Sequence, residues 1–358
     1  MRVLVVNAGS SSLKLRLLGH ADEIERSADL GVDADEVAGV ISDWPTPDVI
    51  GHRIVHGGTE FATPVRVDAR VRTALDALTT LAPLHQPKSL AALDVVTRVL
   101  PEIPAVACFD TAFHATIPPE AATYAVPLEW RERYAIRRYG FHGLSHAYAA
   151  RRAAELIGEP VGQLRIVTCH LGAGASVCAV KGGRSVDTTM GFTPLEGLVM
   201  ATRSGSVDPG LVLWLEEHER LSPAEIADAL EHRSGLLGLA GTSDMRAVER
   251  AAARGDERAR LALDVYVHSL TAGIAAMTSA TGGLDVLVFT GGVGENSAVA
   301  RARTTERLSY LGVAVDPELN EGAVPDVEMS DPTAPVRTFV IAAREDLEIA
   351  AGARSALA

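Results

Sequence analysis

Three things are scarce in this sequence: cysteine, positive charge and an apolar leader. Its three cysteines, Cys108, Cys169 and Cys178, are odd in number and form no CxxC pair, which indicates neither a disulfide framework nor a zinc site. The chain has 33 basic and 46 acidic residues, and its formal charge of −13 argues against sequence-independent binding to nucleic acid or to an anionic membrane. We therefore expect no nucleic-acid and no membrane partner, and any bound anion must be held by local cations and backbone amides.

We also expect neither a targeting segment nor a membrane-spanning segment. The apolar run after Met1 ends by Val6 and lacks the length and the cleavage site of a signal peptide. We identify no later run that reaches the roughly 18 uncharged residues of a membrane span, so we expect a soluble, cytoplasmic protein with buried, reduced thiols.

The 358 residues, 47% of them hydrophobic, are typical of a compact chain. At roughly 100–200 residues per domain, the length favours two domains.

The first segment with chemical interest is NAGSSSLK, residues 7–14. The apolar run 3–6 and the period-two alternation of 13–18 predict two strands joined by this turn. A nucleoside-phosphate loop of the Walker type would need GxxxxGK[ST] between a strand and a helix, and here Leu13, not glycine, precedes Lys14. By its alternation, Lys14 is a strand residue that faces either solvent or a ligand.

Strands and helices alternate along the rest of the chain. Short apolar strands that run into polar or glycine turns are predicted in 49–58, 104–113, 165–180 and 284–297, and helices in 89–100, 146–158, 222–230 and 257–280. This alternation predicts an α/β fold. Residues 3–18 and 166–183 both indicate a strand, a Gly/Ser turn and a second strand. Either the two halves share one plan and offer two hairpins to a polyphosphate, or these are two ordinary hairpins.

Polar residues stand where these strands end, which is where open α/β sheets bind ligands. Arg53 lies between apolar neighbours, Asp110 ends a strand, His142 follows aromatic residues, and Arg203 follows an apolar segment. A buried guanidinium needs an anionic partner, so two arginines in apolar settings within an acidic chain indicate anion binding.

Eight motifs, in chain order, resemble the acetate kinase family, which includes propionate and butyrate kinases. They are NAGSSSLK, HRIVHGG, APLHQP, FDTAFH, RRYGFHGLSH, CHLGAGASV, DTTMGFTPLEGLVMATRSGS and FTGGVGENS. The resemblance runs from residue 3 to about residue 350. It implies two duplicated ribonuclease-H-like domains around a nucleotide cleft, as in actin-like ATPases: residues 1–112 with a C-terminal helix over 345–358, and residues 113–344. It also implies a homodimer formed through the second domain.

The implied reaction is a reversible transfer of phosphoryl from ATP to acetate, giving ADP and acetyl phosphate. A carboxylate is already ionised at neutral pH, so the reaction needs positioning and charge neutralisation and no strong base. The resemblance leaves three alternatives open: a propionate or butyrate kinase, a divergent paralogue with another phosphoryl donor such as pyrophosphate, and a nucleotide-binding relative without transfer.

The resemblance also assigns roles to individual residues. Arg53 would hold the acetate carboxylate, Arg203 the transferring phosphoryl group, and His142 the equatorial oxygens of the transition state; as a plain alternative, His142 is a core histidine. Mg²⁺, with Mn²⁺ as an alternative, would be organised by Asn7, Asp110 and Glu345. The acyl pocket would be lined by Val55, Leu84, Phe141 and Pro194.

The nucleotide would be held from both halves of the chain. The residues expected to bind it are Ser10, Ser12, Lys14, His170, Leu171, Gly172, Ala173, Gly174, Asp244, Met245, Arg246, Gly292, Val293, Gly294 and Asn296. Those around Gly292 would form the adenine slot, because a bare backbone lets a flat base approach closely. Gly292 and Val293 are small enough to leave that slot open, which argues against pyrophosphate as the donor.

The chain departs from the family pattern at three places. Ala173 stands where the family has asparagine, and Ala201 and Ser206 stand where it has glycine and aspartate beside Arg203. In AREDL (343–347) only the glutamate, Glu345, is kept from the family's TNEE. We expect these changes to affect how tightly the nucleotide phosphates are bound and how Arg203 is oriented.

Overall fold

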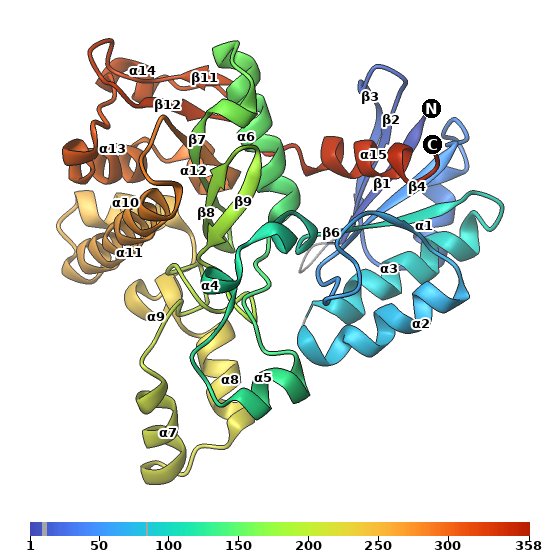
Figure 1. Ribbon diagram of the computed structural model, residues 1–358, viewed down its shortest axis with the longest axis horizontal. Coiled ribbons are helices and arrows are strands. Elements are labelled where there is room, and N and C mark those ends of the chain that lie inside the picture. The colour runs from blue at the N-terminus through green and yellow to red at the C-terminus, as the bar shows by residue number, and fades with distance from the viewer. Residues whose placement is uncertain (9–12, 84) are drawn as a thin grey trace. The chain divides into compact units, whose positions relative to one another are not determined.

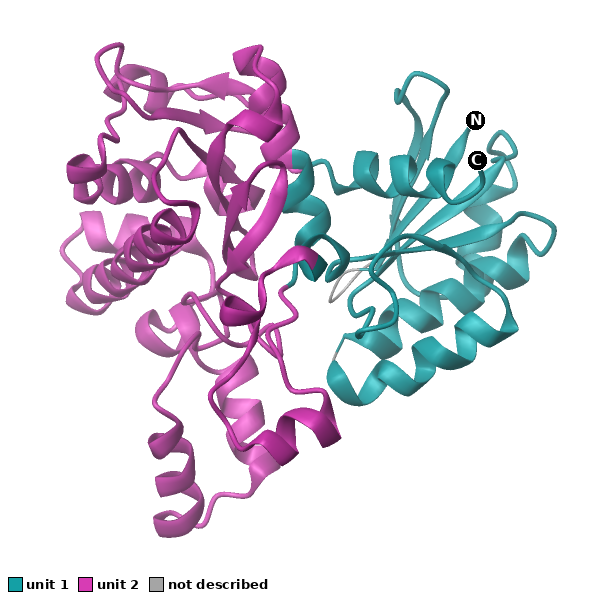
Figure 2. Cartoon of the chain, viewed as in Figure 1, with its two compact units in different colours: residues 1–115, 141–148, 344–358 teal, residues 116–140, 149–343 magenta. Residues whose placement is uncertain are grey.

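The computed structural model describes residues 1–8, 13–83 and 85–358, and within it the chain divides into two compact units (Figures 1 and 2). Unit 1 comprises Met1–Ala115, Phe141–Tyr148 and Arg344–Ala358, and unit 2 comprises Thr116–Gly140 and Ala149–Ala343. The domain limits expected from the sequence, 1–112 with 345–358 and 113–344, stay a prediction.

Unit 1 contains a six-stranded sheet of order β3-β2-β1-β4-β6-β5. Its strands are β1 Val3–Ala8, β2 Leu13–Leu18, β3 Ile24–Leu30, β4 Val49–Ile54, β5 Val65–Arg66 and β6 Ala105–Phe109. Its helices are α1 Ala34–Ile41, α2 Ala69–Ala77, α3 Gln86–Val99 and α15 Glu345–Ser355, with 3₁₀ turns at Leu78–Leu81 and Ala112–Thr116. Strands β1 and β2 pair antiparallel as predicted, whereas β1, β4 and β6 run parallel.

Side-chain alternation assigns the two faces of this sheet to different helices. Leu4, Val6 and Ile50 pack with residues of α1 and α3, whereas Val3, Val5 and Val49 pack with Ile349, Ala350 and Ala353 of α15. Gly51 lies on the α15 face, where an added Cβ would stand 2.6 Å from Ile349 Cγ2. A side chain at this position would therefore push α15 away from β4.

Unit 2 repeats the same plan. Its sheet has the order β11-β12-β10-β7-β8-β9, formed by β7 Arg165–Leu171, β8 Ala175–Lys181, β9 Arg184–Thr188, β10 Val286–Thr290, β11 Val327–Glu328 and β12 Arg337–Val340. In each unit three strands form an antiparallel meander, two more continue parallel to its inner strand, and one short antiparallel strand completes the sheet. The duplication predicted from the two hairpins is confirmed.

The other helices complete the chain. They are α4 Pro119–Ala122, α5 Leu128–Tyr134, α6 Gly143–Ile157, α7 Pro209–His218, α8 Pro223–His232, α9 Gly235–Ala240, α10 Met245–Ala253, α11 Glu257–Thr281, α12 Gly291–Asn296, α13 Ala298–Arg307 and α14 Pro317–Glu321, with 3₁₀ turns at Val161–Gln163 and Ser309–Leu311. The helices predicted in 89–100, 146–158, 222–230 and 257–280 are confirmed as α3, α6, α8 and α11.

Two sequence expectations are wrong. The segment after β10 was expected to be a glycine turn, but residues 291–296 form the short helix α12. In addition, α11 is long and apolar enough to cross a membrane by length and composition alone, although we expected no such segment. Leu263, Val267, Leu270 and Ile274 of α11 are buried, and the helix packs on β7 and β8, so this part of its apolar surface lies in the core of unit 2. The three cysteines are buried thiols, as predicted.

Candidate active site

The first part of the candidate site lies at the carboxyl ends of three neighbouring parallel strands of unit 1. Asn7 is in β1, Arg53 is in β4, and Asp110 follows β6 directly. Alternation places all three on the α15 face, in line with Val5, Gly51 and Cys108. The first residue of α15 is Glu345, so the same face also receives a second carboxylate.

These four side chains form one cluster around the Arg53 guanidinium. Its Nε donates to both Asp110 oxygens, at 2.9 and 3.1 Å, and its Nη2 donates to Asp110 Oδ2 at 2.6 Å. Its Nη1 donates to Asn7 Oδ1 at 3.1 Å and lies 3.8 Å from Glu345 Oε2. Asn7 Nδ2 donates to Glu345 Oε2 at 2.9 Å. The predicted acid-binding arginine and the three predicted metal-binding residues are thus neighbours.

The cluster carries an excess of buried negative charge. The side chains of Arg53, Asp110 and Glu345 are only 16%, 2% and 14% exposed. Burial raises the pKa of Asp110, and Arg53 offsets part of that rise. Burial alone would lower the pKa of Arg53, but Asp110 and Glu345 outweigh it and hold the guanidinium charged. Two carboxylates against one cation leave a deficit of positive charge that a hard divalent ion with oxygen ligands would neutralise.

Phe141 and His142 stand beside this cluster in unit 1. The Gly143 amide donates to the Asp110 carbonyl at 2.8 Å, which ties the start of α6 to the strand that carries Asp110. His142, just before this helix, has a φ of 58°, a left-handed conformation that is strained for a non-glycine residue and gathers at functional sites. Phe141 is buried against the His56 ring, with ring centroids 5.5 Å apart. Val55 is buried as well, whereas Leu84 lies outside the described residues.

In unit 2, the Arg203 side chain contacts the backbone of Pro194, which was predicted to line the acyl pocket. Its Nη1 donates to the Pro194 carbonyl at 3.2 Å, and its Nε lies 3.1 Å from Glu231 Oε2. Burial lowers the pKa of Arg203, and Glu231 partly restores it. The Ser206 hydroxyl accepts from the Gly197 amide at 3.0 Å, and this hydrogen bond joins the two ends of the segment 197–206. The carboxylate beside Arg203 is therefore that of Glu231, which the sequence did not single out.

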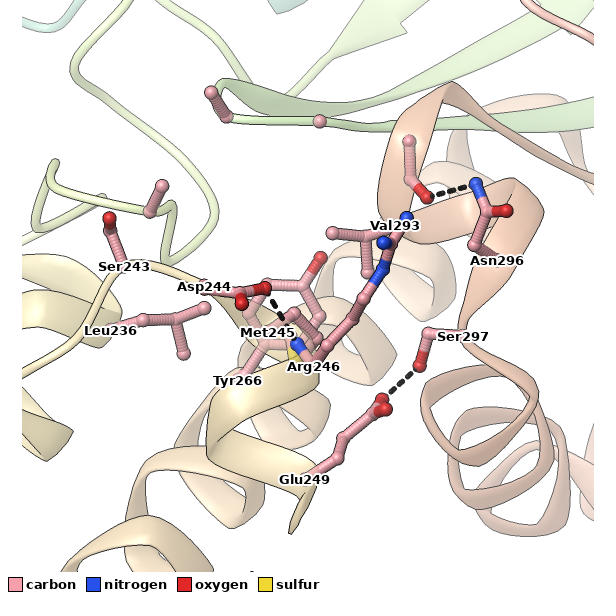
Figure 3. Close-up of a pocket in the computed structure, with 14 residues that line it drawn as sticks. Leu236, Ser243, Asp244, Met245, Arg246, Glu249, Tyr266, Val293, Asn296 and Ser297 are labelled. Atoms are coloured by element: carbon pink, nitrogen blue, oxygen red, sulfur yellow. Dashed lines mark hydrogen bonds between the residues drawn. The ribbon is translucent and has the colours of Figure 1, made fainter. Parts of the chain in front are cut away.

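A pocket with a volume of about 320 Å³ lies within unit 2 (Figure 3). Eight of the residues predicted to bind nucleotide line it: Gly172, Ala173, Asp244, Met245, Arg246, Gly292, Val293 and Asn296. They come from the β7–β8 turn, from the start of α10 and from α12. The volume and the mixed apolar and polar lining are those of a small-molecule site.

Local backbone geometry shapes the walls of this pocket. Asp244 caps α10 by accepting from the Arg246 amide at 3.0 Å, and Asn296 Nδ2 donates to the Gly292 carbonyl at 2.8 Å. Gly291 opens α12 with a φ of 79°, and a Cβ there would lie 2.8 Å from the Leu171 carbonyl oxygen. The Ala201 amide donates to the Ala173 carbonyl at 3.1 Å. Two of the positions that depart from the family pattern therefore meet in one wall of the pocket.

Other predicted residues do not line this pocket. Leu171 and Gly294 are buried, His170 and Gly174 are half-buried in the β7–β8 hairpin, and Lys14 is exposed in β2 of unit 1. Ser10 and Ser12 lie outside the described residues. The roles of all these residues stay predictions.

Sequence reasoning missed several residues of this pocket. Leu236, Ser243, Glu249, Tyr266 and Ser297 also line it. The Ser297 hydroxyl donates to Glu249, which ties the end of α12 to α10. Tyr266 is 3% exposed, and its hydroxyl has no hydrogen-bond partner among the described residues. Leu236, Glu249 and Tyr266 lie in helices and Ser243 and Ser297 lie just outside helix ends, and neither placement separates a pocket wall from ordinary core or loop.

The chain combines a duplicated α/β fold, a small-molecule pocket in unit 2 and a carboxylate–arginine cluster in unit 1, which together favour a phosphotransferase. A sequence profile described as the acetokinase family matches residues 34–351, and the chain belongs to this family. It is 44% identical to the acetate kinase of Thermotoga maritima, over 98% of this chain and 97% of that one. The structure of Porphyromonas gingivalis acetate kinase matches with a TM-score of 0.92, 36% identity and full coverage of both chains. That of a Francisella tularensis propionate kinase matches with a TM-score of 0.92, 35% identity and 99% coverage of both.

Proposed function

We propose that the protein transfers the terminal phosphoryl group of ATP to acetate, reversibly, giving ADP and acetyl phosphate. The observation that carries this proposal is family membership together with the Asn7–Arg53–Asp110–Glu345 cluster and the pocket of unit 2. We further propose that the enzyme acts in the cytoplasm as a homodimer, as the resemblance implied.

Arg53 supplies the positive charge for the acid. Its Nε edge is held by Asp110 in a two-point contact, so the guanidinium plane is fixed before the acid arrives. The acetate carboxylate then approaches an oriented cation and attacks phosphorus as a nucleophile that needs no base. Asp110 thereby acts on the acid through Arg53, and it would also be one of the residues that hold a divalent metal.

Arg203 and His142 receive the charge of the transferring group. Phosphoryl transfer spreads negative charge over the equatorial oxygens, and donors fixed in advance at those oxygens lower the barrier most. Arg203 is fixed by Pro194 and Glu231, and His142 is fixed by its place before the first turn of α6. Val55 and Phe141, both buried in unit 1, would exclude water around the methyl group of acetate.

Asn7, Asp110 and Glu345 would hold Mg²⁺. The donor set fits: two carboxylates and an amide oxygen are hard ligands, and the cluster has one negative charge more than Arg53 neutralises. When bound, the metal would neutralise the charge of the phosphate oxygens and help to orient them. Mn²⁺, which shares these ligand preferences, would replace it.

The pocket of unit 2 would take the adenosine part of ATP. Asp244 and Arg246, at the start of α10, would approach the ribose, and Gly292 and Val293 of α12 would face the base. Gly292 has no side chain and Val293 has a small one, so the wall formed by α12 leaves room for a flat base.

Propionate is the second candidate substrate, because a propionate kinase structure matches this chain as well as an acetate kinase structure does. One methylene changes transition-state binding by only about 1–3 kcal/mol in an apolar pocket. The test is an acyl-hydroxamate assay with ATP, Mg²⁺ and either acetate, propionate or butyrate. The highest kcat/KM is expected for acetate. A tenfold preference for propionate would change the substrate, and ATP binding without any product would refute the transfer reaction.

A further inference from the structure

We propose that Glu231 is a positioning residue that sets the orientation of Arg203; the proposal rests on the function proposed above for Arg203. Glu231 is in the last turn of α8, and its carboxylate oxygen Oε2 lies 3.1 Å from Arg203 Nε. Their side chains are only 12% and 18% exposed, so solvent screens this attraction weakly. The pair is unlike the exposed Asp228–Arg233 ion pair at the end of the same helix.

The position of Glu231 is unfavourable for helix α8 by itself. A helix carries partial negative charge at its carboxyl end, so a carboxylate in the last turn is unfavourable there. The start of α8, by contrast, follows the usual pattern, with Ser222 and Glu225 forming a capping box. A glutamate that opposes the helix dipole in a half-buried place needs a cation, and Arg203 is the cation that the structure places beside it.

The backbones of the two residues are fastened together, so the pair has a fixed geometry. The Ser204 amide donates to the Leu230 carbonyl at 3.0 Å, and the Thr202 hydroxyl donates to the Glu231 carbonyl at 2.9 Å. The Ser234 amide donates to the Thr202 carbonyl at 2.9 Å. Arg203 is therefore flanked on both sides by residues that are bonded to the end of α8.

Glycine is required where this segment meets the turn after α8. Gly235 has a φ of 60°, and a Cβ added to it would lie 2.2 Å from the Met200 carbonyl oxygen and 2.7 Å from that of Arg203. The close approach keeps the backbone of 200–203 against the α8–α9 turn. With both backbones fixed, the ion pair to Glu231 and the bond to the Pro194 carbonyl constrain the guanidinium from two directions.

This fixed geometry lowers the cost of ordering Arg203 for phosphoryl transfer. A long arginine side chain has many rotamers, and ordering it in the transition state costs entropy unless another group has already ordered it. Through its charge contact at Arg203 Nε, Glu231 keeps the guanidinium ready for the phosphoryl oxygens. It touches no substrate and acts through Arg203 alone.

The test is a double-mutant cycle. Glu231→Gln preserves the shape and removes the charge, so we expect kcat to fall about tenfold to a hundredfold, with the KM for ATP unchanged and with Glu231→Asp intermediate. In an Arg203→Ala background, Glu231→Gln should cause no further loss, because the group through which it acts is gone. Asp228→Asn is the matched control: Asp228 lies on the same helix and pairs at 2.8 Å with Arg233 at an exposed site, so its loss should change kcat by less than about twofold.

Three kinetic results would overturn the proposal: wild-type kcat in Glu231→Gln, a loss in Arg203→Ala/Glu231→Gln equal to the product of the two single losses, or a loss in Asp228→Asn equal to that in Glu231→Gln. Should the wild type make no acyl phosphate from any short-chain acid, the proposed function fails, and crystal structures decide the positioning claim separately. In Glu231→Gln the Arg203 guanidinium is expected to leave the Pro194 carbonyl. An unchanged Arg203 in that structure would refute the proposal whatever the activity.

Discussion

His52 makes the stability of this protein depend on pH. It lies in the middle of β4, 1% exposed, on the sheet face opposite to Arg53. Neither ring nitrogen has a hydrogen-bond partner among the described residues. Burial lowers the pKa of His52 to about 3, and Asp94 opposes the drop only in part. A charged imidazole is therefore strongly disfavoured in the folded state.

The sign and size of the effect follow from proton linkage. Between the unfolded pKa of about 6.5 and the folded value, the unfolded chain binds a proton that the folded chain does not, so stability falls as the pH falls. Each pH unit in this window costs about 1.4 kcal/mol, which gives a loss on the order of 3 kcal/mol at pH 4.5 from His52 alone. His56 and His114, whose pKa values are lowered to about 4 by burial, add to the slope in the same direction.

The perturbation is His52→Leu, which fills a similar volume without a titratable group. Urea unfolding of the wild type and the variant at pH 7.0 and pH 4.5 gives the free energies of unfolding. The variant should lose less stability than the wild type over this interval, by about 3 kcal/mol. His20→Gln, at an exposed position of unit 1, is the control and should follow the wild type. Parallel losses in the wild type and in His52→Leu would refute the reasoning.

Three further predictions concern the site. Arg203→Ala should lower kcat by about two or three orders of magnitude with little effect on the Kd for ATP by calorimetry, whereas Arg53→Ala should also raise the KM for acetate; small, equal losses in both would contradict the assigned roles. Val293→Phe should fill the pocket of unit 2 and weaken ATP binding at least about tenfold, without changing the melting of unit 1, and normal affinity would place the nucleotide elsewhere. Chelation of divalent ions with EDTA should abolish turnover, and either Mg²⁺ or Mn²⁺ should restore it; full activity in excess EDTA would exclude the metal role of the Asn7–Asp110–Glu345 set.

Much of the fold could be predicted because local pattern and tertiary structure agree. The alternation in 13–18 and the apolar run in 3–6 predicted a hairpin, and the same pattern in 166–183 predicted a second one. α12 could not be predicted, because GGVGEN has a poor intrinsic tendency to form a helix. Long-range contacts stabilise it: Arg301, buried in α13, donates at 2.9 Å to the carbonyls of Gly294 and Glu295 at its end.

The candidate site, likewise, could be predicted from the sequence only in part. Asn7, Arg53 and Asp110 stand at strand ends, and strand alternation is enough to put them on one face once the strand order is known. Glu231 and Tyr266 are different, because their importance arises only from what faces them in space. In the sequence, Glu231 reads as one more exposed acid on an amphipathic helix, and only the position of Arg203 distinguishes it from Asp228.

The central claim, phosphoryl transfer from ATP to acetate, is tested most directly by ³¹P NMR of the protein with ATP, Mg²⁺ and acetate. We expect the γ-phosphate resonance of ATP to decline while resonances of ADP and acetyl phosphate rise in equal amounts, with no such change in Arg203→Ala. The reverse conversion should follow when ADP and acetyl phosphate are supplied. ATP that stays intact beside acetate, or that yields inorganic phosphate and no acetyl phosphate, would contradict the account.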